Sequence, residues 1–593
     1  MATLVLQAAG AAVGGLFGPF SAAAGRALGG LAGAAIDRSF LGGGRVRAPL
    51  RSVDVTASTE GTPIARAWGR VRLPGQIIWA TRVEAVRTST RSGGKGGSGG
   101  TATESVSYYA NVALGLCEGP VARIGRIWAD GKEIDAGAFT FRLHTGAEDQ
   151  APDPLIVAKE GSENAPAYRG LAYVVFERMP LGDFGNRVPQ LHFEVIRPAG
   201  RLESAIRSVC MIPGSSEFAY DTVPVERVLG IGESAPENRH TSSGDTDFVT
   251  SLDEIAALCP NLKHISLVVA WFGDDLRAGH CSVAPRVDSR TKRTRGAEWS
   301  VAGLNRASAR LVSLHDGRPA YGGSPSDAGV IRAIRAIKAR GIGVTLYPFL
   351  MMDVPADNDL PDPVTGLAPQ PAYPWRGTIR AAGEGTAVAD EEIARFFGTA
   401  AAAHFAVSGE AVSYSGPDEW SWRRFVLHMA ALGRAAGGID AIVIGSEFRD
   451  LTRSRDAAAN YPAVARLAAL AGEVRALLGA GTKITYAADW TEYGAHVLDG
   501  GDEVRFPLDP LWASEYLDAV GVDFYPPVAD WRDGPHHLDR QIAASIYDPA
   551  YLAANVTGGE YQDWYYLDEA ARSRSAPPSP MDSASPGSTV PRI

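Results

Sequence analysis

The sequence predicts a multidomain protein in which a β-rich N-terminal region precedes an α/β domain of the TIM-barrel type. Short strand-like runs separated by turn residues fill positions 45–200. From residue 261 onward, strand-like and helix-like segments alternate, as they do in a parallel sheet. Of the 593 residues, 45% are apolar and 21% are charged, so the chain has enough apolar residues for a sizeable core.

The charge balance excludes a protein whose whole surface binds nucleic acid. The chain has 57 Lys and Arg against 67 Asp and Glu, a formal net charge of -10. Its four cysteines have no C-x-x-C spacing, and its 11 histidines form no H-E-x-x-H pattern. We therefore expect no metal site, no cofactor and no dense disulfide framework.

Residues 1–44 form a Gly/Ala-rich apolar arm. No charged side chain occurs from Leu4 to Gly25, and glycines at positions 10, 14 and 18 give a small-residue stripe that allows close helix packing. The arm lacks the basic start of a secretory signal, so we expect synthesis in the cytoplasm without a signal peptide. Two interpretations stay open: a packing arm inside an oligomer, and a membrane-active helix through residues 4–36.

The β-rich domain is assigned to residues 45–200. Strand-like runs lie at 66–70, 76–79, 106–116, 123–128, 171–176 and 191–195. The Gly/Ser-rich segment 92–100 predicts a flexible linker or a hairpin tip, because this composition does not support a packed strand. Residues 201–260 are assigned to a connecting segment.

The barrel domain is assigned to residues 261–571. The apolar runs Ile265–Phe272 and Ile342–Phe349 are typical of buried strands. Between them, Ser326 caps a helix to Arg340 with its apolar residues on one face. Further helices are expected at 390–405, 418–436 and 461–478, and further strands at 411–415, 441–445, 483–488 and 517–524. Six strands in succession favour a TIM barrel over a doubly wound sheet, because no Gly-rich phosphate loop follows the first strand.

Functional side chains of TIM barrels follow the C-terminal ends of the strands. From the strand assignment alone, the candidates are Trp271, Asp274, Asp275, Tyr347, Glu447, Asp489, Glu492, Asp523 and Tyr525. Aromatic side chains in these positions stack on sugar rings or cap the barrel core. The substrate-binding candidates are Trp271, Tyr347, Trp490 and Tyr525.

Two segments of the β-rich domain resemble a known family. These are GTPIARAWGRVRLPGQIIW at Gly61–Trp79 and YRGLAYVVFERMPLGDFGNRVP at Tyr168–Pro189. Both are similar to the N-terminal part of large tail-tip or baseplate proteins of phages and gene transfer agents. The resemblance covers the chain up to about Arg572, and it implies a hub-like region followed by a glycoside-hydrolase-like TIM barrel.

The resemblance also implies a function. The expected partners are other tail or baseplate proteins, further copies of this chain around the tail axis, and cell-surface glycan, with no specific nucleic acid; the expected location is the tail of a phage-like particle. Glu447 follows the fourth strand in IVIGSE, where the resemblance implies the acid/base carboxylate of a glycosidase. The second carboxylate would come from a seventh strand, which is not identifiable. A structural tail component and a hydrolase of envelope polysaccharide both stay open.

The last segment, residues 572–593, has two interpretations. Ser and Pro supply 11 of its 22 residues and no periodicity is present, which is typical of a disordered tail. Alternatively, a frameshift near Arg572 truncated a longer parent, because a neighbouring frame can encode a strand-like PWVY peptide. The barrel then lacks its last strands and is an incomplete (β/α)8 domain. The coding DNA decides between them: without a continuing frame, the frameshift hypothesis fails.

The segment Arg286–Arg295, RVDSRTKRTR, carries five positive charges and one negative charge. Such a segment contacts phosphate or lipopolysaccharide, or is a solvated loop. Because no aromatic residues are interleaved with the charges, we expect a solvated loop.

Overall fold

The computed structural model describes residues 61, 63–92, 101–212, 214–241, 245–494, 496–498, 502–525, 528–529, 531–556, 565–566 and 590–591. The chain divides into two compact units, Met1–Gly200 and Arg201–Ile593. The predicted arm at 1–44, with its membrane-active alternative, lies outside the described residues, as do the Gly-rich segment 93–100 and most of 572–593. Within the described ranges, no helix is both long and apolar enough to cross a membrane.

The first unit consists mainly of antiparallel strands. One sheet has the order β1-β9-β5-β6, and the other has the order β2-β4-β8-β7 with β3 also paired to β4. The strands are β1 (Gly69–Pro74), β2 (Gln76–Ala80), β3 (Glu84–Ser92), β4 (Thr101–Glu118), β5 (Arg123–Ala129), β6 (Lys132–Ile134), β7 (Phe141–His144), β8 (Leu171–Pro180) and β9 (Leu191–Arg197). The helical segments are η1 (Ala136–Ala138), α3 (Pro154–Glu160) and η2 (Gly182–Phe184).

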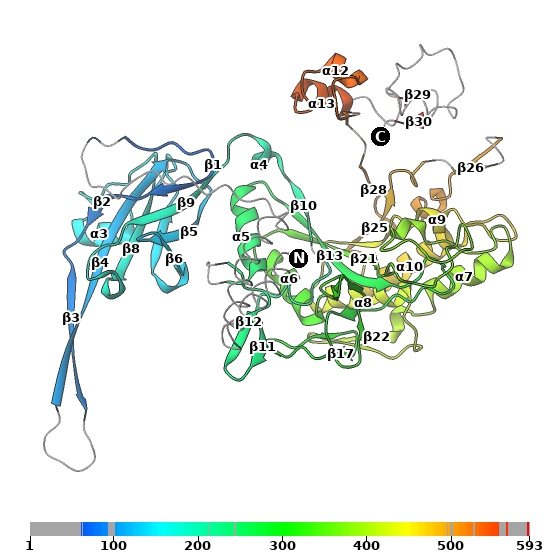
Figure 1. Ribbon diagram of the computed structural model, residues 1–593, viewed down its shortest axis with the longest axis horizontal. Helices are drawn as coiled ribbons and strands as arrows, with labels where there is room; N and C mark the ends of the chain where they lie inside the picture. Colours follow the sequence, from blue (N-terminus) through cyan, green and yellow to red (C-terminus); the bar gives the residue numbers. More distant parts are fainter. Residues whose placement is uncertain are drawn as a thin grey trace, which may run out of the picture. The chain divides into compact units, whose positions relative to one another are not determined.

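The core of this unit joins the two sheets. Phe176 of β8 and Phe193 of β9 are fully buried, with ring centroids 6.3 Å apart. Beyond this core, β4 continues as a two-stranded ribbon with β3, from the pair Glu84–Tyr109 to the pair Ser92–Thr101 (Figure 1). The sequence did not predict β3, because its polar residues lack the apolar alternation of a half-buried strand.

The second unit is built around a parallel sheet of six strands. Its order is β10-β13-β21-β24-β25-β28, so every strand pairs with the next one along the chain. These strands are β10 (Ser208–Met211), β13 (His264–Gly273), β21 (Gly343–Met352), β24 (Ala441–Ser446), β25 (Lys483–Asp489) and β28 (Gly521–Asp523). Sequential parallel strands linked through helices are the arrangement of a TIM barrel, which has eight strands when closed. In the described part of the chain, β10 and β28 are the edge strands.

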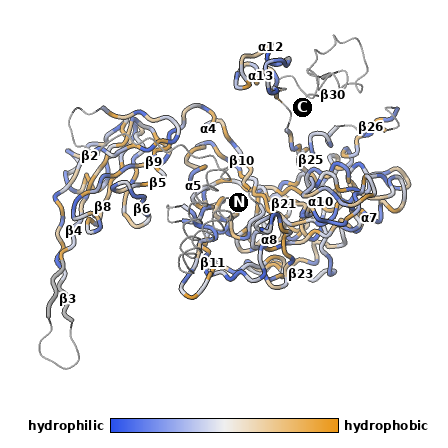
Figure 2. Tube along the Cα trace, in the orientation of Figure 1, coloured by the Kyte–Doolittle hydropathy of each residue, from blue (hydrophilic) through white to orange (hydrophobic). Residues whose placement is uncertain are grey.

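The helices of this unit are α4 (Leu202–Ala205), α5 (Asp247–Leu258), α6 (Asp327–Lys338), η3 (Arg376–Thr378), α7 (Ala387–Phe397), η4 (Ala402–His404), α8 (Trp422–Ala435), α9 (Arg449–Thr452), α10 (Pro462–Leu478), α11 (Asp509–Trp512), α12 (Leu538–Ile542) and α13 (Pro549–Val556). Of these, α6, α8 and α10 pack on strands of the parallel sheet. Figure 1 shows α6 and α8 on the same side of β13 and β21. Their apolar side chains join those of the strands in one large core. Figure 2 shows apolar stretches along β21 and α8.

Helix α6 illustrates how the sequence specifies these elements. The Ser326 hydroxyl accepts a hydrogen bond from the backbone N–H of Gly329 at 3.1 Å, which satisfies one free donor of the first turn. Val330, Ile331 and Ile334 are buried on the side that faces the core. The predicted capped amphipathic helix is therefore confirmed.

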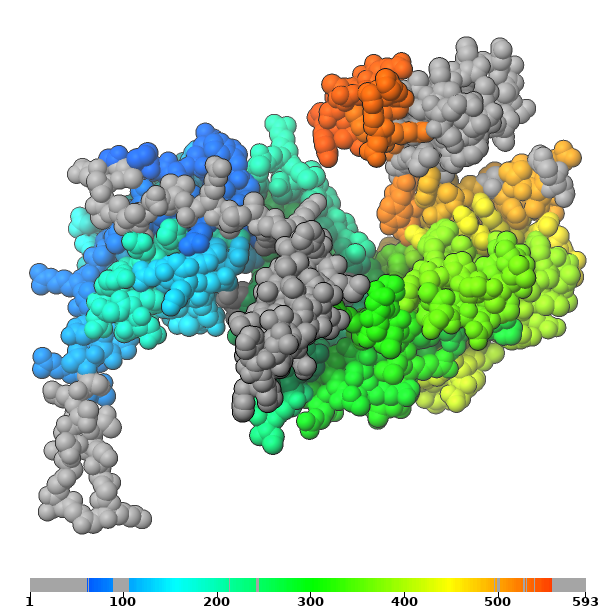
Figure 3. Space-filling model, viewed as in Figure 1, coloured from blue at the N-terminus to red at the C-terminus, as the bar shows by residue number. Residues whose placement is uncertain are grey.

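The second unit also contains small sheets that are separate from the six-stranded sheet. The three-stranded sheet β12-β11-β15 consists of β11 (Glu226–Gly230), β12 (Glu233–Pro236) and β15 (Thr294–Arg295). The pairs are β14 (Arg286–Val287) with β18 (Arg310–Leu311), β16 (Ser300–Val301) with β17 (Leu304–Asn305), β19 (Leu314–His315) with β20 (Arg318–Pro319), β22 (Phe405–Ser408) with β23 (Ala411–Tyr414), β26 (His496–Leu498) with β27 (Glu503–Arg505), and β29 (Tyr565–Tyr566) with β30 (Val590–Pro591). The residues coloured green to yellow form one continuous body in Figure 3.

Two sequence assignments in the barrel domain are wrong. The run 411–415 forms β23, but this strand pairs antiparallel with β22 and is not part of the parallel sheet. The first strand of the sheet is instead β10, which lies inside the segment 201–260 that we assigned as a connection. Strand β10 has only four residues and no long apolar run, so the sequence pattern does not distinguish it from a loop. The sheet has six strands, as expected, but β10 takes the place of the strand expected at 411–415.

The opposite face of the sheet, called the inner face here, carries a small cluster of Val268, Tyr347, Val443 and Ala487. The pKa of Cys210 on β10 is raised by partial burial and then by the charge of Asp523 on β28. The Asp523 charge on one edge strand thus influences a side chain on the other edge strand.

Candidate functional site

Glu447 lies directly after β24, the fourth strand of the sheet. Its side chain is largely buried, and its backbone has a φ of 51°, a left-handed conformation that is uncommon for a residue other than glycine. The backbone N–H of Glu447 donates to the carbonyl of Ala487 on β25 at 2.9 Å. This turn directs the carboxylate away from the helix layer, toward the groups at the strand ends.

Two donors from the loop after β21 hold the Glu447 carboxylate. The indole Nε1–H of Trp375 donates to Oε2 at 2.6 Å, and the Arg376 guanidinium lies 3.0 Å from the same oxygen. Arg376 also donates to the Ser446 hydroxyl at 2.9 Å and lies over the Phe349 ring, 3.8 Å from its centroid. An indole N–H and a guanidinium are both hydrogen-bond donors, so together they suit the ionised form of the carboxylate.

Asp523, at the end of β28, is the second carboxyl group of the site. The Tyr347 hydroxyl donates to its Oδ2 at 2.7 Å. Burial and the adjacent Glu447 carboxylate raise the pKa of Asp523 to about 6, although the Tyr347 hydrogen bond and the Arg376 charge act in the opposite direction. Asp523 therefore gains or loses its proton close to neutral pH.

Glu447 lies near Asp523, since its charge is one of the causes that raise the Asp523 pKa. Trp375 and Arg376 hold the Glu447 carboxylate, and the Tyr347 hydroxyl holds Asp523. The strand ends thus present two neighbouring carboxyl groups, each held by donors of the protein.

The structure brings some of the sequence-predicted residues into this site and leaves others outside it. Tyr347 contacts Asp523, and Tyr525 is 70% exposed, with a pKa raised first by partial burial and then by the charges of Asp523 and Glu447. The backbone N–H of Trp490 donates to the carbonyl of Asp523 at 3.1 Å. Trp271 is fully buried in the helix-side core, where it stacks on Phe425 at 4.6 Å, so it does not reach the inner face.

The remaining strand-end acids stabilise turns. Asp274 accepts from the backbone N–H of Ser282 at 2.8 Å, and Asp275 pairs with Arg277. Asp489 accepts from the backbone N–H of Thr491 at 2.9 Å. Glu492 is buried behind the site and makes contacts described below.

Sequence reasoning missed Trp375 and Arg376. Both come from the long loop after β21, more than twenty residues beyond the strand end, so a rule based on strand ends does not select them. The one feature of the sequence that could have indicated them is that a tryptophan and an arginine are adjacent there.

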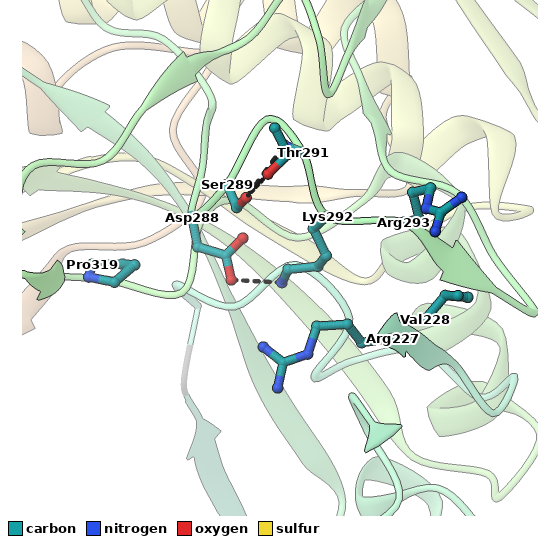
Figure 4. A pocket seen from close by; sticks show the side chains of 8 residues that line it. All are labelled: Arg227, Val228, Asp288, Ser289, Thr291, Lys292, Arg293 and Pro319. Atoms are coloured by element: carbon teal, nitrogen blue, oxygen red, sulfur yellow. Dashed lines mark hydrogen bonds and ion pairs between the residues drawn. The ribbon is translucent and has the colours of Figure 1, made fainter. Parts of the chain in front are cut away.

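A pocket of about 290 Å³ shares no lining residue with the carboxyl pair. It is lined by Arg227, Val228, Asp288, Ser289, Thr291, Lys292, Arg293 and Pro319 (Figure 4). Its lysine is neutralised: the Lys292 ammonium contacts Glu217 at 3.0 Å, Glu237 at 3.0 Å and Asp288 at 2.5 Å. Figure 4 shows Arg293 directed away from Asp288.

These contacts correct part of the expectation for the basic segment 286–295. Lys292 is nearly buried, and Arg286 is buried against Asp353, with 2.6 Å between the charged atoms. Arg290 donates to the carbonyl of Ala309 at 2.9 Å. Arg290, Arg293 and Arg295 are exposed, as expected for a solvated loop, whereas Arg286 and Lys292 are held by ion pairs. The sequence pattern did not indicate these two ion-paired residues, because Glu217, Glu237 and Asp353 are distant in the chain.

Among the residues that the structure describes, no group of three or more His, Cys, Asp or Glu side chains has an arrangement that would hold a metal ion.

Comparison with known proteins bears on the second unit. Residues 420–592 match the family model described as GTA TIM-barrel-like domain. A search of curated proteins returned no match. Among solved structures, a chain from the virion of a native gene transfer agent (GTA) particle is 39% identical, with a TM-score of 0.22; the match covers 31% of this chain and 44% of that one. This chain thus spans less than half the length of that virion protein.

Two similar solved structures are glycoside hydrolases. A GH113 β-1,4-mannanase in a complex is 15% identical, covering 53% of this chain and 62% of that chain with a TM-score of 0.24. The GH113 β-mannanase AaManA from Alicyclobacillus acidocaldarius is 16% identical, covering 49% and 58% with a TM-score of 0.24. The family match and the sequential parallel sheet therefore show that the second unit contains a TIM-barrel-like domain.

Proposed function

We propose that the chain is a structural component of the tail tip of a gene transfer agent-like particle, and that its barrel domain contacts cell-surface glycan without hydrolysing it. The family match over residues 420–592 supports the particle role. The observation that carries the non-hydrolytic role is that donors of the protein hold both carboxyl groups: Trp375 and Arg376 hold Glu447, and Tyr347 holds Asp523.

Glycoside hydrolysis requires two separated carboxyl groups. A retaining enzyme places them about 5–5.5 Å apart on either side of the sugar carbon, and an inverting enzyme about 6.5–9.5 Å apart to admit water. In this chain Trp375 and Arg376 already hold Glu447, and the Tyr347 hydroxyl already holds Asp523. The pair suits recognition of sugar hydroxyls better than cleavage.

Groups around the pair suit a saccharide. The exposed ring of Tyr525 offers an aromatic face next to the two carboxyl groups, and Phe524 is 56% exposed in the same segment. Aromatic faces stack on the C–H face of sugars, while carboxyl and phenol groups exchange hydrogen bonds with sugar hydroxyls. The proposed ligand is therefore a neutral or weakly charged envelope polysaccharide.

Binding and turnover are measured on the same samples. Full-length protein is incubated with envelope polysaccharides extracted from candidate host cells, and bound glycan and newly released reducing ends are both quantified. We expect saturable binding without release of reducing ends, and about tenfold weaker binding for Tyr525→Ala, equivalent to about 1.4 kcal/mol. Tyr547→Ala, which removes another exposed aromatic ring outside the site, should bind like the parent. Equal binding of all three proteins would overturn the assignment of the inner face.

A hydrolase remains the second candidate, because a specific observation favours it. Asp523, with a pKa of about 6, and the neighbouring Glu447 are two carboxyl groups that could serve as acid and base in one place. If the pair hydrolysed a glycan, release of reducing ends would be lost in both Glu447→Gln and Asp523→Asn. That result would replace the non-hydrolytic proposal.

The particle role needs its own test. A tagged chain is produced in cells that release gene transfer agent particles, and purified particles are examined by immunogold labelling. We expect label at one end of the tail and more than one copy per particle. Particles that lack the tag, or that carry it on the head, would overturn the tail-tip role.

A further inference from the structure

Glu492 is a buried acid outside the carboxyl pair. It is 1% exposed and lies in the turn that follows β25. Its Oε1 accepts hydrogen bonds from the Thr452 hydroxyl at 2.6 Å and from the Tyr486 hydroxyl at 2.8 Å, and its Oε2 accepts from the backbone N–H of Asp489 at 3.1 Å. Burial raises the pKa of Glu492 to about 7. Burying an acid lowers the stability of the fold. The contacts of Glu492 are therefore expected to have a role.

The contacts of Glu492 lead to the backbone beside Glu447. The Tyr486 hydroxyl donates to Glu492 and accepts a hydrogen bond from the backbone N–H of Phe448 at 2.8 Å. Phe448 directly follows Glu447 in the chain. The N–H groups of both residues are therefore bonded to β25: one to the Ala487 carbonyl and the other to the Tyr486 side chain.

This anchoring matters because the turn is strained. A left-handed backbone at a residue with a Cβ costs roughly 1–2 kcal/mol and persists only where surrounding contacts hold it. The Tyr486 ring also packs closely under the turn, since a Cβ added to Gly445 would lie 3.1 Å from that ring. The buried tyrosine supports the turn by both packing and hydrogen bonding.

We propose that Glu492 and Tyr486 are positioning residues, which hold the backbone at Glu447 and Phe448 so that the Glu447 carboxylate stays near Asp523 and on its partners Trp375 and Arg376. The inference rests on the proposed role of the carboxyl pair in the inner face. Glu492 fixes the Tyr486 hydroxyl, and that hydroxyl fixes the Phe448 N–H. Neither residue contacts the ligand in this proposal.

The readout is the titration of Asp523 in the full-length protein. Its carboxyl resonance is followed by NMR in a chain labelled with ¹³C-aspartate and is assigned by its absence from Asp523→Asn. Tyr486→Phe keeps the buried ring and removes the hydroxyl. We expect the Asp523 pKa to fall from about 6 by about one pH unit or more, because the raising effect of Glu447 weakens when its carboxylate moves away.

Two further variants separate positioning from general destabilisation. Glu492→Gln keeps an acceptor for the Tyr486 hydroxyl and should leave the Asp523 pKa within about 0.3 pH unit of the parent, whereas Glu492→Leu should resemble Tyr486→Phe. Thr452→Val also removes a hydrogen bond to Glu492, but Thr452 does not connect to the Phe448 N–H. It should lower the melting temperature without moving the Asp523 titration.

An unchanged Asp523 pKa in Tyr486→Phe would overturn the proposal, as would an equal fall in Thr452→Val. If Glu492→Leu does not fold, the comparison of Tyr486→Phe with Thr452→Val still decides. The titration needs no glycan, so its outcome is independent of the binding assay. Failure of glycan binding with the expected titration would remove the proposed function and leave the positioning role in place.

Discussion

At the scale of the residue, Asp523 is subject to opposing influences on its ionisation. Burial and the Glu447 carboxylate favour the neutral acid, while the Tyr347 hydroxyl and the Arg376 charge favour the anion. The first pair prevails, since the pKa is raised from 3.8 to about 6. In the unfolded chain these influences are lost and the pKa returns to about 3.9. The carboxyl pair therefore links stability to pH.

The sign of this linkage gives a prediction for Asp523→Asn. The folded state holds the proton more tightly, so the stabilisation is complete below about pH 4 and is lost as pH rises through about 6. The asparagine cannot ionise. We expect the parent to lose roughly 2 kcal/mol relative to the variant between pH 4 and pH 7, at about 1.4 kcal/mol per pH unit of pKa difference. Urea unfolding at four pH values measures this, and parallel curves would contradict it.

Sequence patterns predicted the residues of the site that lie at strand ends but not those that lie in a loop. Glu447, Tyr347 and Asp523 were among the expected strand-end residues, because alternating apolar runs mark where strands stop. Trp375 and Arg376 were not, because a loop of irregular backbone carries them back to the fourth strand. Trp271 ends an apolar run equally well, but its position in the strand directs it into the helix-side core.

At the scale of the element, β28 depends on one glycine. Strand β28 has three residues and pairs with β25, where Gly521 lies opposite Ala487. A Cβ at Gly521 would lie 2.3 Å from the Tyr486 carbonyl oxygen and 2.8 Å from the Thr485 hydroxyl. The carbonyl belongs to the sheet backbone, so it cannot move aside without disturbing β25. The close approach that seats Asp523 near Glu447 therefore requires glycine.

Gly521→Ala is expected to separate β28 from β25. Overpacking of this kind costs about 1–3 kcal/mol or more. Hydrogen exchange of the amides of residues 521–523 should become about tenfold faster or more, and the Asp523 pKa should fall. Gly481→Ala is the matched control, because an added Cβ there has no atom within 4 Å. Unchanged exchange in Gly521→Ala, or equal acceleration in both variants, would contradict the prediction.

Elements differ in how much local sequence specifies them. Helix α6 was predicted from its cap and its apolar face, which are properties of a few neighbouring residues. Strands β10 and β23 have the same length, yet only β10 belongs to the parallel sheet. Pairing depends on which distant strand lies alongside, and a four-residue run does not encode that partner.

At the scale of the whole molecule, the chain has two units with separate cores. Phe193 lies in the core of the first unit, and Phe425 lies in the core of the second. Each core joins residues of its own unit, and the units divide between Gly200 and Arg201. Units with separate cores are expected to unfold as separate cooperative transitions.

Differential scanning calorimetry of the full chain should therefore resolve two transitions. Truncation of a buried phenylalanine costs about 3–5 kcal/mol. Phe193→Ala should lower the midpoint of one transition and Phe425→Ala the midpoint of the other, each leaving the second transition in place. A single transition lowered by both substitutions would show that the two cores unfold together.

The sequence by itself determined the alternation of strands and helices, the capped helix α6, the β-rich start and the position of Glu447 after a strand, because these depend on periodicities and short motifs within one segment. The tertiary structure alone decided which strands form the parallel sheet, that Asp523 lies near Glu447, and that loop residues Trp375 and Arg376 hold the Glu447 carboxylate. These features arise from contacts between residues far apart in the chain, and local patterns carry no record of such contacts.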